Sequence, residues 1–156
     1  MTDAPQVARI YVESWNAGFG ELLGRRELTN MEVTRWSTDL VDDRARWWVA
    51  EEDGAVVGFV GICPSRDPVD PELGELDSIA VDPGRWRCGV GRALMKVALD
   101  ALAEDGYQKA VLWTPAGHEG GRAFYERMGW RSTGADRADG RHVAFATELR
   151  RPLRGS

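Results

Sequence analysis

A short stretch at residues 87–92, RCGVGR, has the residue types of an anion-binding loop. It follows a strand-like run and opens a helix-like run. The start of a helix presents unpaired N–H groups and the positive end of the helix dipole. Glycines such as Gly89 and Gly91 let the backbone curl, so that several N–H groups converge on one anion. With Arg87 and Arg92 beside them, a phosphate group is the natural ligand.

Two specific nucleotide-binding motifs do not fit this stretch. The Rossmann fingerprint needs a third glycine where this chain has Leu94, and the Gly-Lys-Ser/Thr of a P-loop is absent. The Gly-x-Gly pair alone therefore leaves two interpretations, a phosphate cradle or an ordinary strand-to-helix turn.

Two carboxylates and two thiols are the other candidates for chemistry. Glu75 and Asp77 begin the run ELDSIAVDP, and strand alternation places both on one face. Such a pair suits proton transfer, whereas the alternative is a solvated strand start. Cys88 lies in the glycine stretch with no base nearby in sequence and is interpreted as a small loop residue. Cys63 is interpreted as a packing residue at a strand end.

The elements that must position these residues alternate between helix and strand patterns. The predicted order is two helices, three strands, a helix, a strand, a helix and two strands. The clearest signals are a hairpin turn at Asp53-Gly54 and the helix after the glycine stretch, which Gly106 ends. This order predicts an α/β domain of the α+β type with a mixed sheet.

Several local signals set the expected boundaries. Asp3 is expected to cap the first helix and Asn30 the second. The stretch GFGELLG at 18–24 is expected to break the first helix. The segment CPSRDPVDPELG at 63–74 holds three prolines and is expected to be a loop.

Length and composition limit the class of protein. The 156 residues predict a single domain over residues 1–156, and the net charge of −5 argues against nucleic acid as a partner. Two cysteines without metal-ligand spacing and two histidines predict no metal site. No membrane-length apolar run and no signal peptide are present, so we expect a cytoplasmic protein that does not bind membranes.

The stretch SIAVDPGRWRCGVGRALM, followed later by GRAFYERMGW, resembles the GCN5-related N-acetyltransferase (GNAT) family. The resemblance covers roughly residues 5–150. The family signature is Val-x-Pro at a strand end, then Arg/Gln-x-x-Gly-x-Gly/Ala opening a helix, and later a short helix with a tyrosine that ends in Gly-aromatic. The matching residues are Val81, Pro83, Gly89, Gly91, Tyr125, Gly129 and Trp130.

The resemblance implies a GNAT-like fold: a mixed, mostly antiparallel, twisted sheet with a splayed parallel strand pair and flanking helices. The first strand of the family is missing from the pattern of this chain, which leaves RWWVAEE at 46–52 as an edge strand. Exposed edges are usually covered, so we expect a homodimer or a segment folded over this edge.

The resemblance also implies acetyl-CoA as cosubstrate. The backbone of the central strand would pair with the pantetheine arm, and the glycine stretch would hold the pyrophosphate. His118 stands where the family often has an asparagine that contacts the cofactor. Trp86 replaces the family's Arg or Gln and cannot supply its polar contact. The implied cofactor-binding residues are Ile79, Ala80, Val81, Arg87, Cys88, Gly89, Val90, Gly91, Arg92 and His118.

The implied activity is N-acetyl transfer to a primary amine of a small molecule or protein, by direct attack in a ternary complex. Tyr125 matches the family's general acid for the leaving thiolate, and Glu75 stands where some members have the general base. The alternative for Tyr125 is a core aromatic beside Phe124 and Met128. The rival function is a non-catalytic CoA-binding regulatory module, which the departures at Trp86 and His118 favour.

Overall fold

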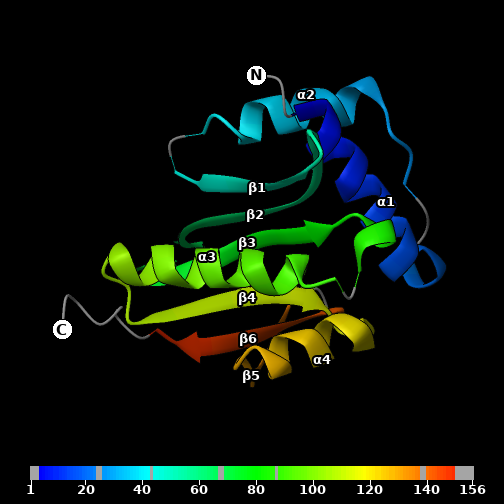
Figure 1. The fold of residues 1–156 in the computed structure, drawn as a ribbon. Helices are drawn as coiled ribbons and strands as arrows, with labels where there is room; N and C mark the ends of the chain where they lie inside the picture. The colour runs from blue at the N-terminus through cyan, green and yellow to red at the C-terminus, as the bar shows by residue number, and fades with distance from the viewer. Residues whose placement is uncertain are drawn as a thin grey trace. The chain divides into compact units, whose positions relative to one another are not determined.

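The computed structural model describes residues 4–23, 26–42, 44–66, 69–86, 88–137 and 140–149. Its helices and strands follow the predicted order (Figure 1). They are α1 (Ala4–Leu23), α2 (Asn30–Asp39), β1 (Arg46–Glu52), β2 (Ala55–Arg66), β3 (Val69–Val81), the 3-10 turn η1 (Pro83–Arg85), α3 (Val90–Glu104), β4 (Lys109–Pro115), α4 (Glu119–Arg127), β5 (Arg131–Arg137) and β6 (His142–Glu148).

The strands form one six-stranded sheet in the order β1-β2-β3-β4-β6-β5. Strands β3 and β4 are parallel, whereas β4 and β5 each run antiparallel to β6. This mixed sheet confirms the predicted α+β fold, and β1 lies at an edge as expected. Helix α1 begins at Ala4, the first described residue.

The chain divides into two compact units. The first comprises residues 1–61 and 78–94, and the second comprises residues 62–77 and 95–156. Strands β2 and β3 and helix α3 contribute to both. The prediction of one domain over the whole chain stays a prediction.

Aromatic side chains fill the core of the first unit. Trp36 of α2 is fully buried, with ring centroids 5.1 Å from Phe59, 5.3 Å from Trp47 and 5.5 Å from Tyr11. A Cβ on Gly61 would lie 2.3 Å from the Trp47 indole, so only glycine leaves room for that ring on β2. The edge strand therefore turns one of its two tryptophans into the core.

Two arginines, Arg26 before α2 and Arg35 within it, pack on aromatic residues of α1. The Arg26 guanidinium lies 4.1 Å from the Trp15 ring centroid, and Arg26 and Arg35 each lie 5.2 Å from that of Tyr11. The Asn16 amide holds the Arg26 backbone by accepting from its N–H at 2.6 Å and donating to its carbonyl at 2.9 Å. These contacts bring the residues that follow α1 back onto that helix.

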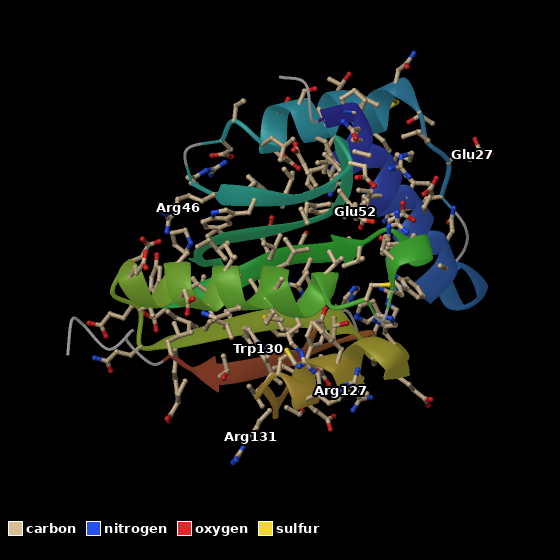
Figure 2. All side chains as sticks on the ribbon, in the orientation of Figure 1. Glu27, Arg46, Glu52, Arg127, Trp130 and Arg131 are labelled. Carbon is tan, nitrogen blue, oxygen red and sulfur yellow. The ribbon has the colours of Figure 1, made fainter. Side chains whose placement is uncertain are left out.

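In the second unit, α3 and α4 pack on the sheet through close contacts. Gly74 of β3 lies under α3, because an added Cβ would be 2.5 Å from Leu102. On β6, Phe145 contacts Tyr125 of α4. Trp130, labelled in Figure 2, follows α4 and is 1% exposed, whereas every residue of β5 is exposed.

Two helix boundaries differ from the sequence expectations. Helix α1 continues to Leu23, so the glycines at 18 and 20 do not break it. Glycine inside a helix costs only about 1 kcal/mol per residue, which tertiary contacts can offset. Helix α2 is capped by Thr29 rather than Asn30, since the Thr29 hydroxyl accepts from the Glu32 N–H at 3.2 Å. Asp3 lies outside the described residues.

The expectation of a loop at 63–74 is wrong for most of that segment. Strand β2 continues to Arg66 and β3 begins at Val69, so Pro64 and Pro71 both lie in strands and are exposed. Proline is tolerated in a strand where its missing N–H has no partner to bond. Since β2 has twelve residues and β1 has seven, the end of β2 with Pro64 extends beyond β1.

The predicted turns are confirmed. Asp53 and Gly54 both adopt positive φ, as a tight hairpin requires, and Gly106 and Gly129 follow α3 and α4 with φ of +97°. Among the described helices, none offers an apolar stretch that could span a bilayer.

Candidate active site

The first group of candidate site residues, in the first unit, is the end of β3 and the turn that leads to α3. Ile79, Ala80 and Val81 are half-buried. The Asp82 N–H then donates to the Val57 carbonyl of β2 at 2.8 Å, and the Asp82 carboxylate accepts from the Gly84 N–H at 3.0 Å. The strand end is thus fixed to β2 before the chain turns away.

Two ion pairs hold the turn to its neighbours. Arg85 of η1 pairs with Glu52 at the end of β1 at 3.1 Å, and Figure 2 shows Glu52 at that end of the strand. Arg9 of α1 lies 3.6 Å from Asp82. Both pairs are partly exposed and contribute little stability each, but together they restrict where the turn can lie.

Gly89 has the conformation that an anion-binding loop needs. Its φ is +87°, and an added Cβ would meet nothing within 4 Å, so the requirement for glycine is conformational rather than steric. Helix α3 starts at the next residue, Val90, and Gly91 lies in its first turn. The first N–H groups of α3 have no acceptor within the helix, which leaves them available to an anion.

The remaining predicted cradle residues surround this turn. Cys88 and Arg92 are exposed, and the Cys88 thiol donates to the Trp86 carbonyl at 3.6 Å. Arg87 lies outside the described residues. Trp86 is 44% exposed, and its indole N–H donates to the Val81 carbonyl at 2.8 Å. The Trp86 side chain therefore makes a polar contact within the protein.

Gly58 is a residue of the first group that the sequence patterns missed. An added Cβ would lie 2.9 Å from Leu94, 3.1 Å from the Ala80 carbonyl oxygen and 3.2 Å from Val90. Glycine on β2 therefore lets the start of α3 lie close to the end of β3. No local signal identifies Gly58, because all three contacts are distant in sequence.

A second group of candidate residues, in the second unit, includes Tyr125 on α4. Its ring centroid lies 5.7 Å from that of Phe124 and 6.1 Å from that of Phe145. Part of the residue surface stays exposed, yet loss of solvent around the hydroxyl raises the pKa of Tyr125 to about 12. The phenol is therefore protonated at neutral pH and able to donate.

Glu75 is buried rather than solvated. It is 6% exposed and pairs in register with Val111 of β4, whose side chain lies on the same face of the sheet. A Cβ added to the adjacent Gly74 would point to the opposite face, toward Leu102 of α3. The alternative of a solvated strand start is wrong for Glu75.

Cys63 joins the two predicted carboxylates. Its thiol, a carboxylate oxygen of Glu75 and one of Asp77 all lie within 4.8 Å of one another. Cys63 is not in a disulfide and is 7% exposed, and Asp77 is half-buried. Interpreting Cys63 only as a strand-end packing residue missed this contact. The three donor atoms are close enough to hold a cation, so the absence of a metal stays a prediction.

His118 precedes α4 and is the N-cap residue of that helix without a capping side chain. Its ring lies against the backbone of Gly121, where an added Cβ would be 2.1 Å from Nδ1. Burial lowers the pKa of His118, so the ring is neutral at neutral pH. His118 therefore lies at the N-terminal end of the helix that carries Tyr125.

The model of the acetyltransferase (GNAT) family matches residues 5–130 of this chain. The chain belongs to the GNAT family. Human N-acetyltransferase 8 is 35% identical over 89 residues, which are 56% of this chain, and the chain spans 39% of that protein's length.

Solved structures of acetyltransferases share the fold. An acetyltransferase from Thermus thermophilus superposes with a TM-score of 0.75 at 20% identity, covering 94% of this chain and 91% of that one. PaiA N-acetyltransferase from Thermoplasma acidophilum, solved in complex with coenzyme A, gives a TM-score of 0.72 at 15% identity, covering 94% and 93%. The GNAT fold predicted from the two motifs is confirmed.

Proposed function

We propose that the chain is an acetyl-CoA-dependent N-acetyltransferase. It would transfer the acetyl group directly, in a ternary complex, to a primary amine of a small molecule or protein. The observation that carries the proposal is the anchored turn before α3, with Gly89 at φ +87°, in a chain that belongs to the GNAT family. A relative of the same fold was solved with coenzyme A bound, which supports this ligand.

The turn fits a coenzyme A diphosphate. A loop with a left-handed glycine before the N-terminus of a fifteen-residue helix presents several backbone N–H groups to one anion. Arg92 is exposed beside them and Arg87 is next to the loop in sequence. The backbone of residues 79–81 would pair with the pantetheine arm, as an added strand does. His118 would contact the cofactor as a neutral ring.

Acetyl-CoA supplies the acetyl group as a thioester. Glu75 would take a proton from the attacking amine, and its burial on a strand keeps the carboxylate in a defined position. Tyr125 would donate its phenolic proton to the leaving thiolate, since its pKa of about 12 keeps it protonated. A backbone N–H of β3 would stabilise the oxyanion.

A screen of primary amines with acetyl-CoA tests the proposal by release of free thiol. We expect at least one amine to raise thiol release well above the slow hydrolysis measured without acceptor. The Tyr125→Phe variant is the matched control, because it retains the ring and loses only the hydroxyl. Acetyl-CoA binding without turnover for every amine would refute the catalytic proposal.

One observation favours the rival, a CoA-binding module without catalysis. The Trp86 indole already bonds the Val81 carbonyl, which the pantetheine arm would otherwise use. Under the rival, coenzyme A would bind but Tyr125→Phe and Glu75→Gln would change nothing measurable. The same screen decides between the two, since only an enzyme gives acceptor-dependent thiol release.

A further inference from the structure

We propose that Cys63 is a positioning residue that orients the Glu75 carboxylate. The inference rests on the proposed function, because it takes Glu75 as the general base. Its basis is the cluster of Cys63, Glu75 and Asp77, whose thiol and carboxylate oxygens all lie within 4.8 Å of one another. Neither the family motifs nor the spacing along the chain points to Cys63.

The cluster lies on rigid elements. Cys63 is on β2, and Glu75 and Asp77 are two residues apart on β3, so their side chains share one face. On the other side, Glu75 is in register with Val111 of the parallel strand β4. Groups held on strands keep their positions better than groups on loops, so the thiol and the carboxylate stay close together.

The chemistry of a thiol suits this place. A thiol is a weak donor of one hydrogen bond, whereas an ionised carboxylate only accepts. An S–H bond to Glu75 would therefore fix the direction of the carboxylate while stabilising its charge less than a hydroxyl would. A carboxylate stabilised less strongly is the better proton acceptor. The proton of the amine goes to a Glu75 oxygen, and the Cys63 proton stays on sulfur.

A nucleophilic role for Cys63 fits the surroundings poorly. The thiolate is the nucleophilic form, and nearby carboxylates and burial both oppose its formation. Orientation of the base is the role that burial and the two carboxylates both support.

The first test compares Cys63→Ala with Cys63→Ser in the amine assay. We expect Cys63→Ala to lower kcat about tenfold with little change in the KM for acetyl-CoA, because only the orientation of the base is lost. Cys63→Ser should recover most of kcat, and the acidic limb of its rate profile should move to lower pH. Ile62→Val is the matched control, since it removes one methylene from a neighbouring buried residue.

The result that overturns the proposal is equally specific. If Cys63→Ala and Ile62→Val lose the same small amount of activity and neither Cys63 variant moves the pH profile, Cys63 only packs.

A second test needs no turnover. In a Cys88→Ser background Cys63 is the one remaining thiol, so its S–H stretching band can be assigned in the infrared spectrum. We expect a band lowered by hydrogen bonding, which shifts upward in Glu75→Gln because a carboxamide accepts more weakly. Glu148→Gln, an exposed carboxylate on β6, should leave the band unchanged.

The two tests separate the two kinds of failure. If the S–H band stays at the same position in both Glu75→Gln and Asp77→Asn, the positioning role is wrong, whether or not the protein acetylates amines. A band that responds to Glu75→Gln, in a protein that acetylates no amine, overturns the base role and with it the proposed function, while the contact itself stands.

Discussion

Tyr125 carries the sharpest prediction for a single residue. Tyr125→Phe keeps the ring beside Phe124 and Phe145 and removes one hydroxyl. If that hydroxyl protonates the leaving thiolate, kcat should fall by about 10²–10⁴-fold, the range for general acid catalysis. Acetyl-CoA affinity should change little, because the hydroxyl acts in the transition state. Steady-state kinetics and calorimetry measure the two quantities.

The pH dependence of kcat in the wild type provides the control for this variant. Since the pKa of Tyr125 is about 12, its phenol stays protonated up to about pH 10. No alkaline limb from this residue is expected below that pH. A variant with unchanged kcat at saturating acceptor would exclude Tyr125 from the mechanism.

The same pKa predicts a pH dependence of stability. An unfolded tyrosine ionises near pH 10, whereas Tyr125 in the folded chain ionises near 12. Between these values ionisation favours the unfolded chain, so stability present below pH 10 is lost as pH rises through 12. The wild type should lose up to about 2 kcal/mol more than Tyr125→Phe over this interval. Urea unfolding at both ends of it measures the difference, and equal losses would contradict burial of the hydroxyl.

Gly89→Ala tests the backbone of the cradle. The substitution meets no neighbouring atom, so its cost of about 1–2 kcal/mol comes from the left-handed φ. We expect coenzyme A affinity to fall about tenfold, as measured by calorimetry. Gly134→Ala on β5 is the matched control, because Gly134 has φ +82° and open space around it. Equal affinities in the two variants would argue against a cradle at Gly89.

At the scale of elements, Gly58 controls how closely α3 approaches the end of β3. Gly58→Val would place its Cβ 3.1 Å from the Ala80 carbonyl oxygen, which as backbone cannot move cheaply. We expect a loss of about 1–3 kcal/mol in stability, as for overpacked cores, and weaker coenzyme A binding. Gly120→Ala on α4, where an added methyl meets nothing, should keep or raise the melting temperature and leave binding unchanged. If Gly58→Val binds coenzyme A as tightly as the wild type, the close approach of α3 to the end of β3 is not required for coenzyme A binding.

The elements that the sequence predicted well are those with local signals. The hairpin at Asp53-Gly54 and the ends of α3 and α4 depend on residues that adopt positive φ, and these were identified from turn and capping patterns. The apolar periodicity of α3 was equally local. The sequence also predicts the motif residues of the cradle and Tyr125, because each of the two family motifs is a short continuous stretch.

The features that escaped prediction depend on contacts between distant residues. The close approach of Gly58 to Ala80 and the proximity of Cys63 to Glu75 each involve one residue of β2 and one of β3. Pro64 and Pro71 suggested a loop because no local signal shows that β2 continues past β1. The burial of Glu75 likewise depends on which strands flank it, and spacing alone carries no such information.

At the scale of the whole molecule, the edge strand β1 bears on assembly. Trp47 packs into the core and its indole N–H donates to the Asp39 carbonyl at 3.1 Å, so only part of the expected apolar area is available. The backbone of β1 still forms one edge of the sheet. Because uncovered edges favour pairing, we expect a homodimer.

Light scattering at several concentrations measures the assembly. A Val49→Pro substitution on β1 removes a backbone donor and should yield monomers. Dimers that persist unchanged in this variant would place the interface elsewhere, and a monodisperse wild-type monomer would refute the dimer.

The hydrogen bond between Trp86 and the Val81 carbonyl has a kinetic consequence. If the pantetheine arm takes that carbonyl, only molecules whose indole has swung away are competent to bind, and the apparent affinity is reduced by their fraction. The cost then falls on the rate of association rather than on the lifetime of the complex. An indole bonded to the strand end would thus act as a gate, setting how fast the cosubstrate enters.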